Sequence, residues 1–318
     1  MLTPKLLSML WCPSCQAGAL EAVGEPNGVG SPKEGELQCG ACHVSFPIHF
    51  GFPMLIPESS LTGDEWGVWR SHLEKLQARR ASRIENQGET INRLSMKSKP
   101  QRPFAKFVGI ESGTVLDIGC GPGKFRRNFD LDRVHYVGLD PMTLPEVSDF
   151  DFVQGVAEFI PFREGSFTDV VVLAALDHFR DLDRFLVEAR RVLQPGGRLH
   201  VLQSVHEVRG PISAIKVLAH EVKDAWEERI SDDHGSDVPK HLDEFTTKSL
   251  INRLSGAFDV ERIERYTATW YSPVKMFSSF VPRSEPPQRI PTAMPATSST
   301  TRSASRATSA LTRPSRSR

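Results

Sequence analysis

No apolar run in this chain of 318 residues approaches the roughly 18 residues that a membrane-spanning helix requires. The first ten residues contain a single lysine and no small-residue cleavage site, so they make a poor signal peptide. Hydrophobic residues make up 39% and charged residues 25% of the chain, which allows a sizeable core. We therefore expect a cytoplasmic protein of two domains without a membrane span.

Acidic residues are absent after Glu285, where six arginines follow. Residues 1–285 consequently hold 33 basic and 39 acidic side chains, and this net charge of about −6 suits the phosphate backbone of RNA or DNA poorly. Residues 284–318 are rich in Ser, Thr, Pro, Ala and Arg and have almost no large apolar side chains, so we expect a disordered tail. We favour a solvated extension over a tail that contacts nucleic acid.

Cysteine is scarce too, but four of the five cysteines form two C-x-x-C pairs separated by 23 residues. Each pair places two thiolates on one tight turn, and two such turns can close a tetrahedron around Zn²⁺. Disulfides are disfavoured in a cytoplasmic chain, and a redox C-x-x-C motif is not expected twice. We therefore predict a structural zinc ion, with His43 as a polar neighbour. Its ligands are Cys12, Cys15, Cys39 and Cys42.

The stretch Thr114–Gly123 is an apolar run that ends in Asp117 and then breaks into three glycines spaced two apart. A buried parallel strand followed by a glycine turn lets the backbone approach a ligand, because no Cβ stands in the way. Asp117 lies at the carboxyl end of the strand, where open α/β sheets bind their ligands, and its charge suits an amine or a cation.

Three kinds of ligand compete for this glycine turn. A phosphate-binding loop needs four residues between its first glycine and a Gly-Lys pair, whereas only three separate Gly119 from Gly123, and the required Ser or Thr is Phe125. A dinucleotide site prefers G-x-G-x-x-G, and this turn is G-x-G-x-G. S-adenosylmethionine fits better, because the next strand, Val134–Asp140, ends in an acid placed to accept hydrogen bonds from two ribose hydroxyls.

Several segments between Val115 and Val205 resemble the class I S-adenosylmethionine-dependent methyltransferases, in particular the broad type 11 family. They are Val115–Gly123, Val137–Asp140, Gly155–Glu158 with Ile160–Phe162, Phe167–Val172 and Arg190–Gly197. The resemblance implies an α/β fold with a doubly wound, Rossmann-like sheet that is mostly parallel and has an antiparallel last strand. It says little about the methyl acceptor, because one fold serves many functions.

The residues that we expect to hold the cofactor lie at the turns that follow the strands. They are Asp117, Gly119, Cys120, Gly121, Gly123, Asp140, Pro141, Met142, Val156, Ala157, Glu158 and Ala174. One position departs from the family pattern, because Val156 stands where an acid usually holds the adenine amino group. The backbone of Val156 and Ala157 must then suffice for the adenine.

The N-terminal segments Leu6–Cys15, Leu37–Cys42 and Phe46–Pro57 resemble the small zinc ribbon of activator subunits of tRNA and protein methyltransferases. A unit of this size holds no core of its own without a metal, so the zinc is expected to be structural. We divide the chain into a zinc ribbon over 1–57, a helical linker or lid over 58–110, a methyltransferase domain over 111–283 and the tail over 284–318.

Trp66, Trp69, Leu73 and Leu76 recur at helical spacing and predict an amphipathic helix ahead of the first strand, followed by a weaker pattern up to Lys99. In similar methyltransferases such helices cover the cofactor and shape the acceptor pocket; we favour packing over a substrate cage for the two tryptophans. Further strands are predicted at 150–154, 169–175 and 199–203, helices at 182–193, 212–230 and from Thr246 or Thr247 to Gly256, and a closing antiparallel pair at 258–263 and 266–271.

Methyl transfer from a sulfonium is an in-line displacement, so the enzyme mainly has to align the acceptor and exclude water. His178, just after the fourth strand, is our candidate general base, with Asp177 placed to bias its tautomer. A positioning or structural role fits His178 equally well. His241 is a weaker candidate for contacting the acceptor, and a plain loop histidine is the simpler interpretation.

We therefore expect a methyltransferase that uses S-adenosylmethionine, contains a structural Zn²⁺ and modifies a small-molecule, lipid or glycan-intermediate acceptor. Two alternatives stay open. One is an rRNA or tRNA base methyltransferase in which the ribbon and the arginine-rich tail bind RNA. The other is a cofactor-binding partner protein without activity of its own.

Overall fold

The computed structural model describes residues 2–23, 34–78, 100–142, 150–205, 244–267 and 274–283. The predicted helix over 212–230, the candidate residue His241 and the tail over 284–318 lie outside these ranges. The domain boundaries given above stay predictions.

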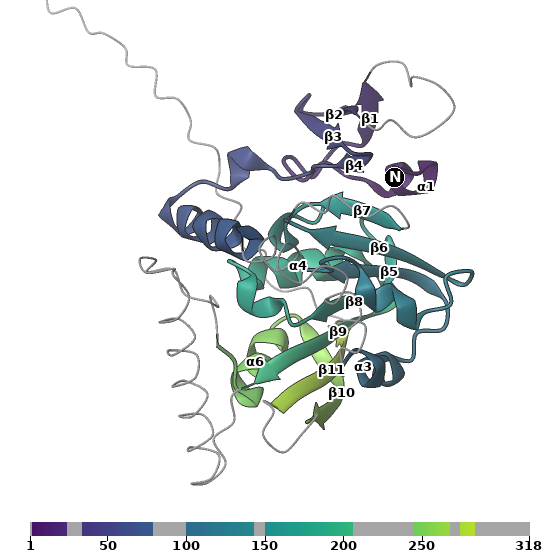
Figure 1. Ribbon diagram of the computed structural model, residues 1–318, viewed down its shortest axis with the longest axis vertical. Coiled ribbons are helices and arrows are strands. Elements are labelled where there is room, and N and C mark those ends of the chain that lie inside the picture. Colours follow the sequence, from purple (N-terminus) through teal and green to yellow (C-terminus); the bar gives the residue numbers. More distant parts are fainter. Residues whose placement is uncertain are drawn as a thin grey trace, which may run out of the picture. The chain divides into compact units, whose positions relative to one another are not determined.

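A seven-stranded sheet with the order β10-β11-β9-β8-β5-β6-β7 is the larger layer of the described structure (Figure 1). The strands from β5 to β9 pair in parallel, while β10 and β11 are antiparallel, which confirms the predicted doubly wound sheet. Their bounds are β5 Gly113–Ile118, β6 Val134–Asp140, β7 Asp151–Gln154, β8 Phe167–Leu173, β9 Leu193–Val205, β10 Phe258–Tyr266 and β11 Val274–Pro282.

Successive residues of the central strands alternate between two apolar clusters, as side chains on opposite faces of a sheet must. Leu116 and Val170 belong to the cluster that also holds the apolar residues of α4 (Leu182–Val192) and α6 (Thr247–Leu254). Val115 and Val171 belong to the cluster that holds those of α3 (Gln101–Val108). Helices therefore cover both faces, and the ligand-binding edge is left to the loops that follow the strands.

Several bounds differ from the sequence-based expectation; β9, for example, begins at Leu193 and not at Leu199. The strand that pairs with β10 is β11, Val274–Pro282, and Tyr266 still belongs to β10. Residues 268–271 of the predicted partner strand lie outside the described ranges. Met276, Phe277 and Phe280 of β11 are buried, so this segment offers the apolar face that the sheet requires. The helix α3 lies within the segment 58–110 that was predicted to be helical, beyond the apolar pattern that ended at Lys99. Its apolar residues, Phe104 and Phe107, pack on β11.

The N-terminal part forms a four-stranded antiparallel sheet in the order β1-β2-β3-β4, preceded by a short helix (Figure 1). The elements are α1 Pro4–Met9, β1 Leu20–Val23, β2 Gly35–Cys39, β3 Ser45–His49 and β4 Phe52–Pro53. Thr3 caps α1, since its side chain accepts a hydrogen bond from the backbone N–H of Leu6.

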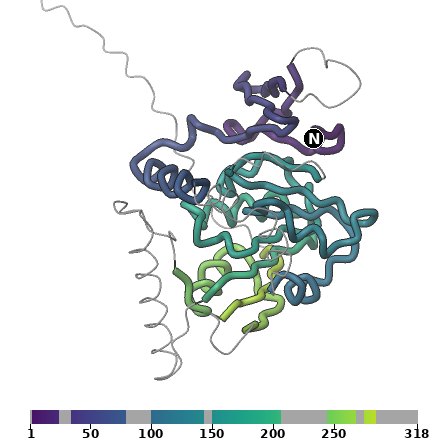
Figure 2. The backbone as a smooth tube through the Cα atoms, viewed as in Figure 1, coloured from purple at the N-terminus to yellow at the C-terminus, as the bar shows by residue number. Residues whose placement is uncertain are grey.

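This N-terminal unit is seated on β7, the edge strand of the large sheet (Figure 2). The N–H of Leu55 donates to the carbonyl of Gln154 at 2.7 Å, and the N–H of Trp11 donates to the carbonyl of Pro161 at 3.0 Å. Buried residues of both parts, among them Leu6, Leu37 and Val153, form one continuous apolar cluster. The unit therefore pairs with the edge strand at Gln154 and shares the core of the sheet.

Candidate active site

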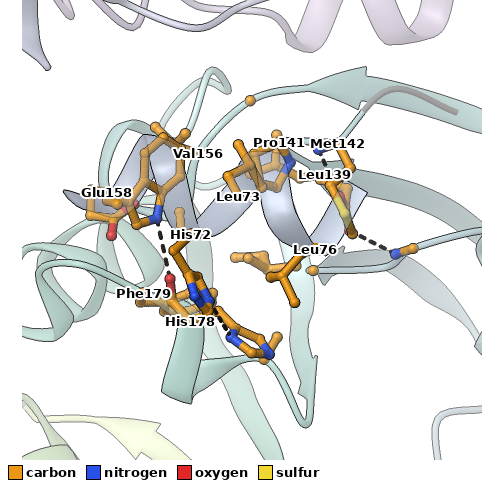
Figure 3. Close-up of a pocket in the computed structure, with 18 of the residues that line it drawn as sticks. His72, Leu73, Leu76, Leu139, Pro141, Met142, Val156, Glu158, His178 and Phe179 are labelled. Atoms are coloured by element: carbon orange, nitrogen blue, oxygen red, sulfur yellow. Dashed lines mark hydrogen bonds between the residues drawn. The ribbon is translucent and has the colours of Figure 1, made fainter. Parts of the chain in front are cut away.

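A cavity of about 260 Å³ opens at the carboxyl ends of β5, β6, β7 and β8 and is covered by a helix over residues 64–78 (Figure 3). Nine of the twelve residues predicted to hold the cofactor line it: Gly119, Gly121, Asp140, Pro141, Met142, Val156, Ala157, Glu158 and Ala174. The candidate base His178 lines it as well. The sequence reasoning missed His72 and Phe179, which also belong to the lining.

The glycine turn after β5 is built by left-handed backbone. Gly119, Gly121 and Gly123 have φ values of 69°, 51° and 62°, which side-chain-bearing residues rarely adopt. A Cβ on Gly119 would lie 2.5 Å from the Cβ of Ala175, so this position also requires glycine for packing. A Cβ on Gly121 would have no heavy atom within 4 Å beyond its chain neighbours, so the space beside Gly121 is open toward the cavity.

Asp140 ends β6 at the rim of the cavity and is 2% exposed. Its carboxylate accepts hydrogen bonds from the backbone N–H of Gly121 at 2.8 Å and from that of Met142 at 2.9 Å. One side chain thus fixes the glycine turn and the turn after β6 relative to each other.

Asp117, Cys120 and Gly123 were predicted to contact the cofactor but do not line the cavity. Asp117 is 1% exposed, and its carboxylate accepts a hydrogen bond from the hydroxyl of Tyr136 on β6. Burial and the nearby charge of Asp140 raise the pKa of Asp117 to about 7, against the opposing effect of the Tyr136 hydrogen bond. A direct role for these three residues in binding stays a prediction.

The turn after β7 presents backbone to the cavity. Val156 and Ala157 line it with little exposed surface. Glu158 follows, but its carboxylate accepts hydrogen bonds from the backbone N–H groups of Arg180 at 2.6 Å and Asp181 at 3.2 Å. Burial nevertheless raises the pKa of Glu158. The two hydrogen bonds that Glu158 accepts therefore stabilise the loop ahead of α4.

Ala174, directly after β8, has a φ of 52° and lines the cavity. A non-glycine residue with this backbone conformation is strained, and strain of this kind concentrates at functional sites. The N–H of Ala174 donates to the carbonyl of Leu202 on β9 at 2.7 Å, which holds the turn in place. The turn then leads into a short helical segment, η4 (Leu176–His178).

Two hydrogen bonds fasten helix 64–78 to the segment after β8. The indole Nε1 of Trp69 donates to the carbonyl of His178 at 3.2 Å, and the rings of His72 and His178 are joined between Nε2 and Nδ1 at 3.0 Å (Figure 3). Trp66 and Trp69 also pack edge to face, with centroids 5.5 Å apart, in a cluster with Phe159. Both tryptophans thus pack in this cluster as predicted, and Trp69 lines the cavity as well.

The four predicted zinc ligands lie together in the N-terminal unit, with all four Sγ atoms within 4.8 Å of one another. The Sγ atoms of Cys12 and Cys42 are 3.7 Å apart, and those of Cys15 and Cys39 are 3.6 Å apart. Tetrahedral Zn–S bonds of about 2.3 Å place sulfur atoms about 3.8 Å from each other, so the cluster fits a structural Zn²⁺. His43 and Cys120 are not members of the cluster.

The cavity lining suits the cofactor predicted from the sequence. Backbone at Gly119 and Gly121 can be approached closely, the Asp140 carboxylate can accept from ribose hydroxyls, and the apolar side chains of Pro141, Met142 and Val156 can flank a purine. The remaining lining residues come mostly from helix 64–78 and η4. Those from the helix and from η4 and its C-cap are Trp69, His72, Leu73, Leu76, His178 and Phe179, and the others are Ile118, Leu139, Gly155 and Ala175.

The sheet order and the cavity at its strand ends correspond to the fold of the class I S-adenosylmethionine-dependent methyltransferases. Residues 116–201 match the type 11 family model described as a methyltransferase domain, and residues 3–51 match that of the Trm112p-like proteins. The chain therefore contains a segment that matches the type 11 methyltransferase domain and, ahead of it, a segment that matches the Trm112p-like proteins.

Relatives of the larger domain include the ubiquinone/menaquinone biosynthesis C-methyltransferase UbiE of Haemophilus ducreyi, which is 33% identical over 123 residues, or 34% of this chain and 48% of that protein. The demethylmenaquinone methyltransferase of Renibacterium salmoninarum is 30% identical over 122 residues, or 36% of this chain and 52% of that protein. The chain thus spans about half the length of these relatives.

A solved structure with a similar fold is the 1,6-didemethyltoxoflavin-N1-methyltransferase of Burkholderia thailandensis, with bound 1,6-didemethyltoxoflavin and S-adenosylhomocysteine. It is 16% identical, covers 81% of this chain and 98% of its own, and has a TM-score of 0.47. In the part of the chain that the structure describes, no helix combines the length and the apolar character needed to cross a membrane.

Proposed function

We propose that this protein transfers a methyl group from S-adenosylmethionine to a small, largely apolar acceptor. The observation that carries the proposal is the part of the cavity lined by helix 64–78 and the segment after β8, which we take as the acceptor side. Its lining combines the apolar side chains of Trp69, Leu73, Leu76 and Phe179 with two histidines. Apolar walls with a few polar groups are typical of sites for small organic ligands. The names of the relatives, which are quinone-type C-methyltransferases, support an acceptor of this class.

The chain's own residues can perform three tasks in such a reaction. The glycine turn and Asp140 hold the cofactor, which supplies an electrophilic methyl group when bound. Helix 64–78 covers the cavity and excludes water from it, and aligning the reactants in this way contributes roughly 7–11 kcal/mol to catalysis. His178 accepts the proton of an acceptor that must lose one.

Incubation of the purified chain with tritiated S-adenosylmethionine and a short-chain demethylmenaquinol, in parallel with total tRNA and rRNA, tests the proposal. We expect tritium in the organic extract and none in RNA. Binding of S-adenosylhomocysteine is measured first by calorimetry, so that a missing acceptor is distinguished from a missing cofactor site. Binding without transfer to any acceptor would instead support a non-catalytic partner protein.

An RNA base methyltransferase is the second candidate, because the N-terminal unit matches the Trm112p-like family and the sequence ends in an arginine-rich tail. The net charge of about −6 over residues 1–285 opposes this candidate. Filter binding compares the whole chain with a variant that ends at Glu285. We expect both to bind tRNA only in the non-specific range, roughly 10⁻⁴–10⁻⁶ M at physiological salt, whereas tight binding that depends on the tail would favour RNA as the acceptor.

A further inference from the structure

We propose that His72 is a positioning residue for the candidate base: it accepts a hydrogen bond from Nδ1–H of His178 and thereby keeps the lone pair of His178 on Nε2. This inference rests on the proposed methyl transfer and adds a residue that no sequence pattern indicated. The two rings belong to different elements, since His72 lies on helix 64–78 and His178 lies on η4, and both line the cavity (Figure 3).

The chemistry of two bonded imidazoles limits how many protons the pair can hold. Nε2 of His72 and Nδ1 of His178 are 3.0 Å apart, so one of these nitrogens carries a proton and the other accepts it. One additional proton can bind to an outer nitrogen without breaking this bond. A second additional proton would leave two donors facing each other, so the pair has the capacity of a general base for a single proton.

Burial decides which ring takes that proton. His72 is 3% exposed, whereas His178 is only partly buried at the cavity. His178 is therefore the ring that an acceptor in the cavity reaches, and it is the ring that takes the proton in this proposal. A protonated His178 has hydrogens on both nitrogens, and its Nδ1–H must therefore donate to Nε2 of His72.

The proton balance of the step follows from this arrangement. The O–H, N–H or C–H bond of the acceptor breaks, its proton binds Nε2 of His178, and the electron pair that remains on the acceptor atom forms the bond to the methyl group. The bond between the methyl group and sulfur breaks, its electron pair stays on sulfur, and S-adenosylhomocysteine leaves as a neutral thioether. The positive charge that the sulfonium loses is then carried by the imidazolium. The charge-assisted hydrogen bond to His72 stabilises that imidazolium.

The place of His72 on helix 64–78 links the candidate base to the acceptor side of the cavity. It shares helix 64–78 with Trp69, Leu73 and Leu76, which form the apolar wall of the acceptor side. The hydrogen bond of Trp69 to the carbonyl of His178 fixes the same segment. The helix that shapes the acceptor side therefore also supplies the group that sets the tautomer of the base.

Two measurements test the proposal on the whole chain. Nitrogen-15 NMR of the histidine rings, with His178 assigned by the variant His178→Gln, reports the tautomer without cofactor or acceptor. We expect the proton of His178 on Nδ1 in the wild type and a mixture of tautomers in His72→Leu. A proton on Nε2 in the wild type would overturn the proposal.

Kinetics with tritiated S-adenosylmethionine and the short-chain demethylmenaquinol provide the second measurement. General-base catalysis contributes about 10²–10⁴-fold, and we expect His72→Leu to lower kcat by about 10–100-fold with KM nearly unchanged. His72→Gln, whose amide oxygen can accept the same hydrogen bond, should retain most of the rate. Glu74→Gln, an exposed change on the same helix, is the matched control.

Equal losses in His72→Gln and His72→Leu would indicate a packing role and overturn the proposal. His178→Gln combined with His72→Leu should be no slower than His178→Gln alone, because the two residues act as one unit. If no acceptor is methylated, the proposed function fails, while the tautomer measurement still decides the role of His72.

Discussion

Replacing Asp117 by asparagine should make the protein more stable at high pH, and the gain can be worked out from the burial of this carboxyl. The folded state raises its pKa from 3.8 to about 7, so the folded protein binds a proton that the unfolded chain releases. The free energy of unfolding of the wild type therefore falls as pH rises between these values, by about 4 kcal/mol in all. Asparagine is neutral and can still accept from the hydroxyl of Tyr136.

Urea unfolding followed by far-ultraviolet circular dichroism at pH 5 and pH 8.5 tests this reasoning. Relative to low pH, linkage lowers the free energy of unfolding of the wild type by roughly 2 kcal/mol at pH 5 and by about 4 kcal/mol at pH 8.5. The difference in this free energy between Asp117→Asn and the wild type should therefore widen by about 2–3 kcal/mol between the two pH values. Asp132→Asn, at an exposed position, serves as the control. A difference that stays constant between the two pH values would refute a neutral buried carboxyl at position 117.

Other predictions concern the metal, the cofactor and the tail. Replacing Cys39 and Cys42 by serine should remove one zinc per chain, as measured by elemental analysis. It should also lower Tm by on the order of 10 °C, because the ribbon shares its core with the large sheet. Loss of zinc with an unchanged Tm would contradict a shared core. Gly121→Val should abolish binding of S-adenosylhomocysteine in calorimetry, because the side chain fills the open space of the cavity. Gly165→Val is the control, since Gly165 also has a positive φ and open space around it, and this variant should retain binding. Equal binding by both variants would show that the glycine turn is not part of the cofactor site. A chain ending at Glu285 should methylate the apolar acceptor at the wild-type rate, and a large loss in the tritium assay would show that the tail takes part.

Local sequence patterns predicted much of this protein because each depends on short-range physics. The turn after Ile118 has left-handed backbone at three alternate positions, and the sequence has glycine, which adopts this conformation without strain, at each of them. The C-x-x-C pairs indicated a metal cluster because two thiolates two residues apart fit one tight turn. Strand β6 was predicted with its observed bounds, since a buried parallel strand is a continuous apolar run that ends where the acid begins.

Tertiary structure decided what depends on residues far apart in the chain. The pairing of His72 with His178 across 106 positions has no signature in the sequence, where Asp177 was the obvious partner. The same is true of Asp117, whose strand-end position suggested a ligand contact, although packing against Tyr136 turns its carboxyl into the interior. The seating of the ribbon on β7 likewise arises from backbone hydrogen bonds, which carry no side-chain identity that a sequence could reveal. Sequence alone thus determined the fold and the kinds of ligand, while the contacts that set protonation and couple the two parts exist only once distant segments pack together.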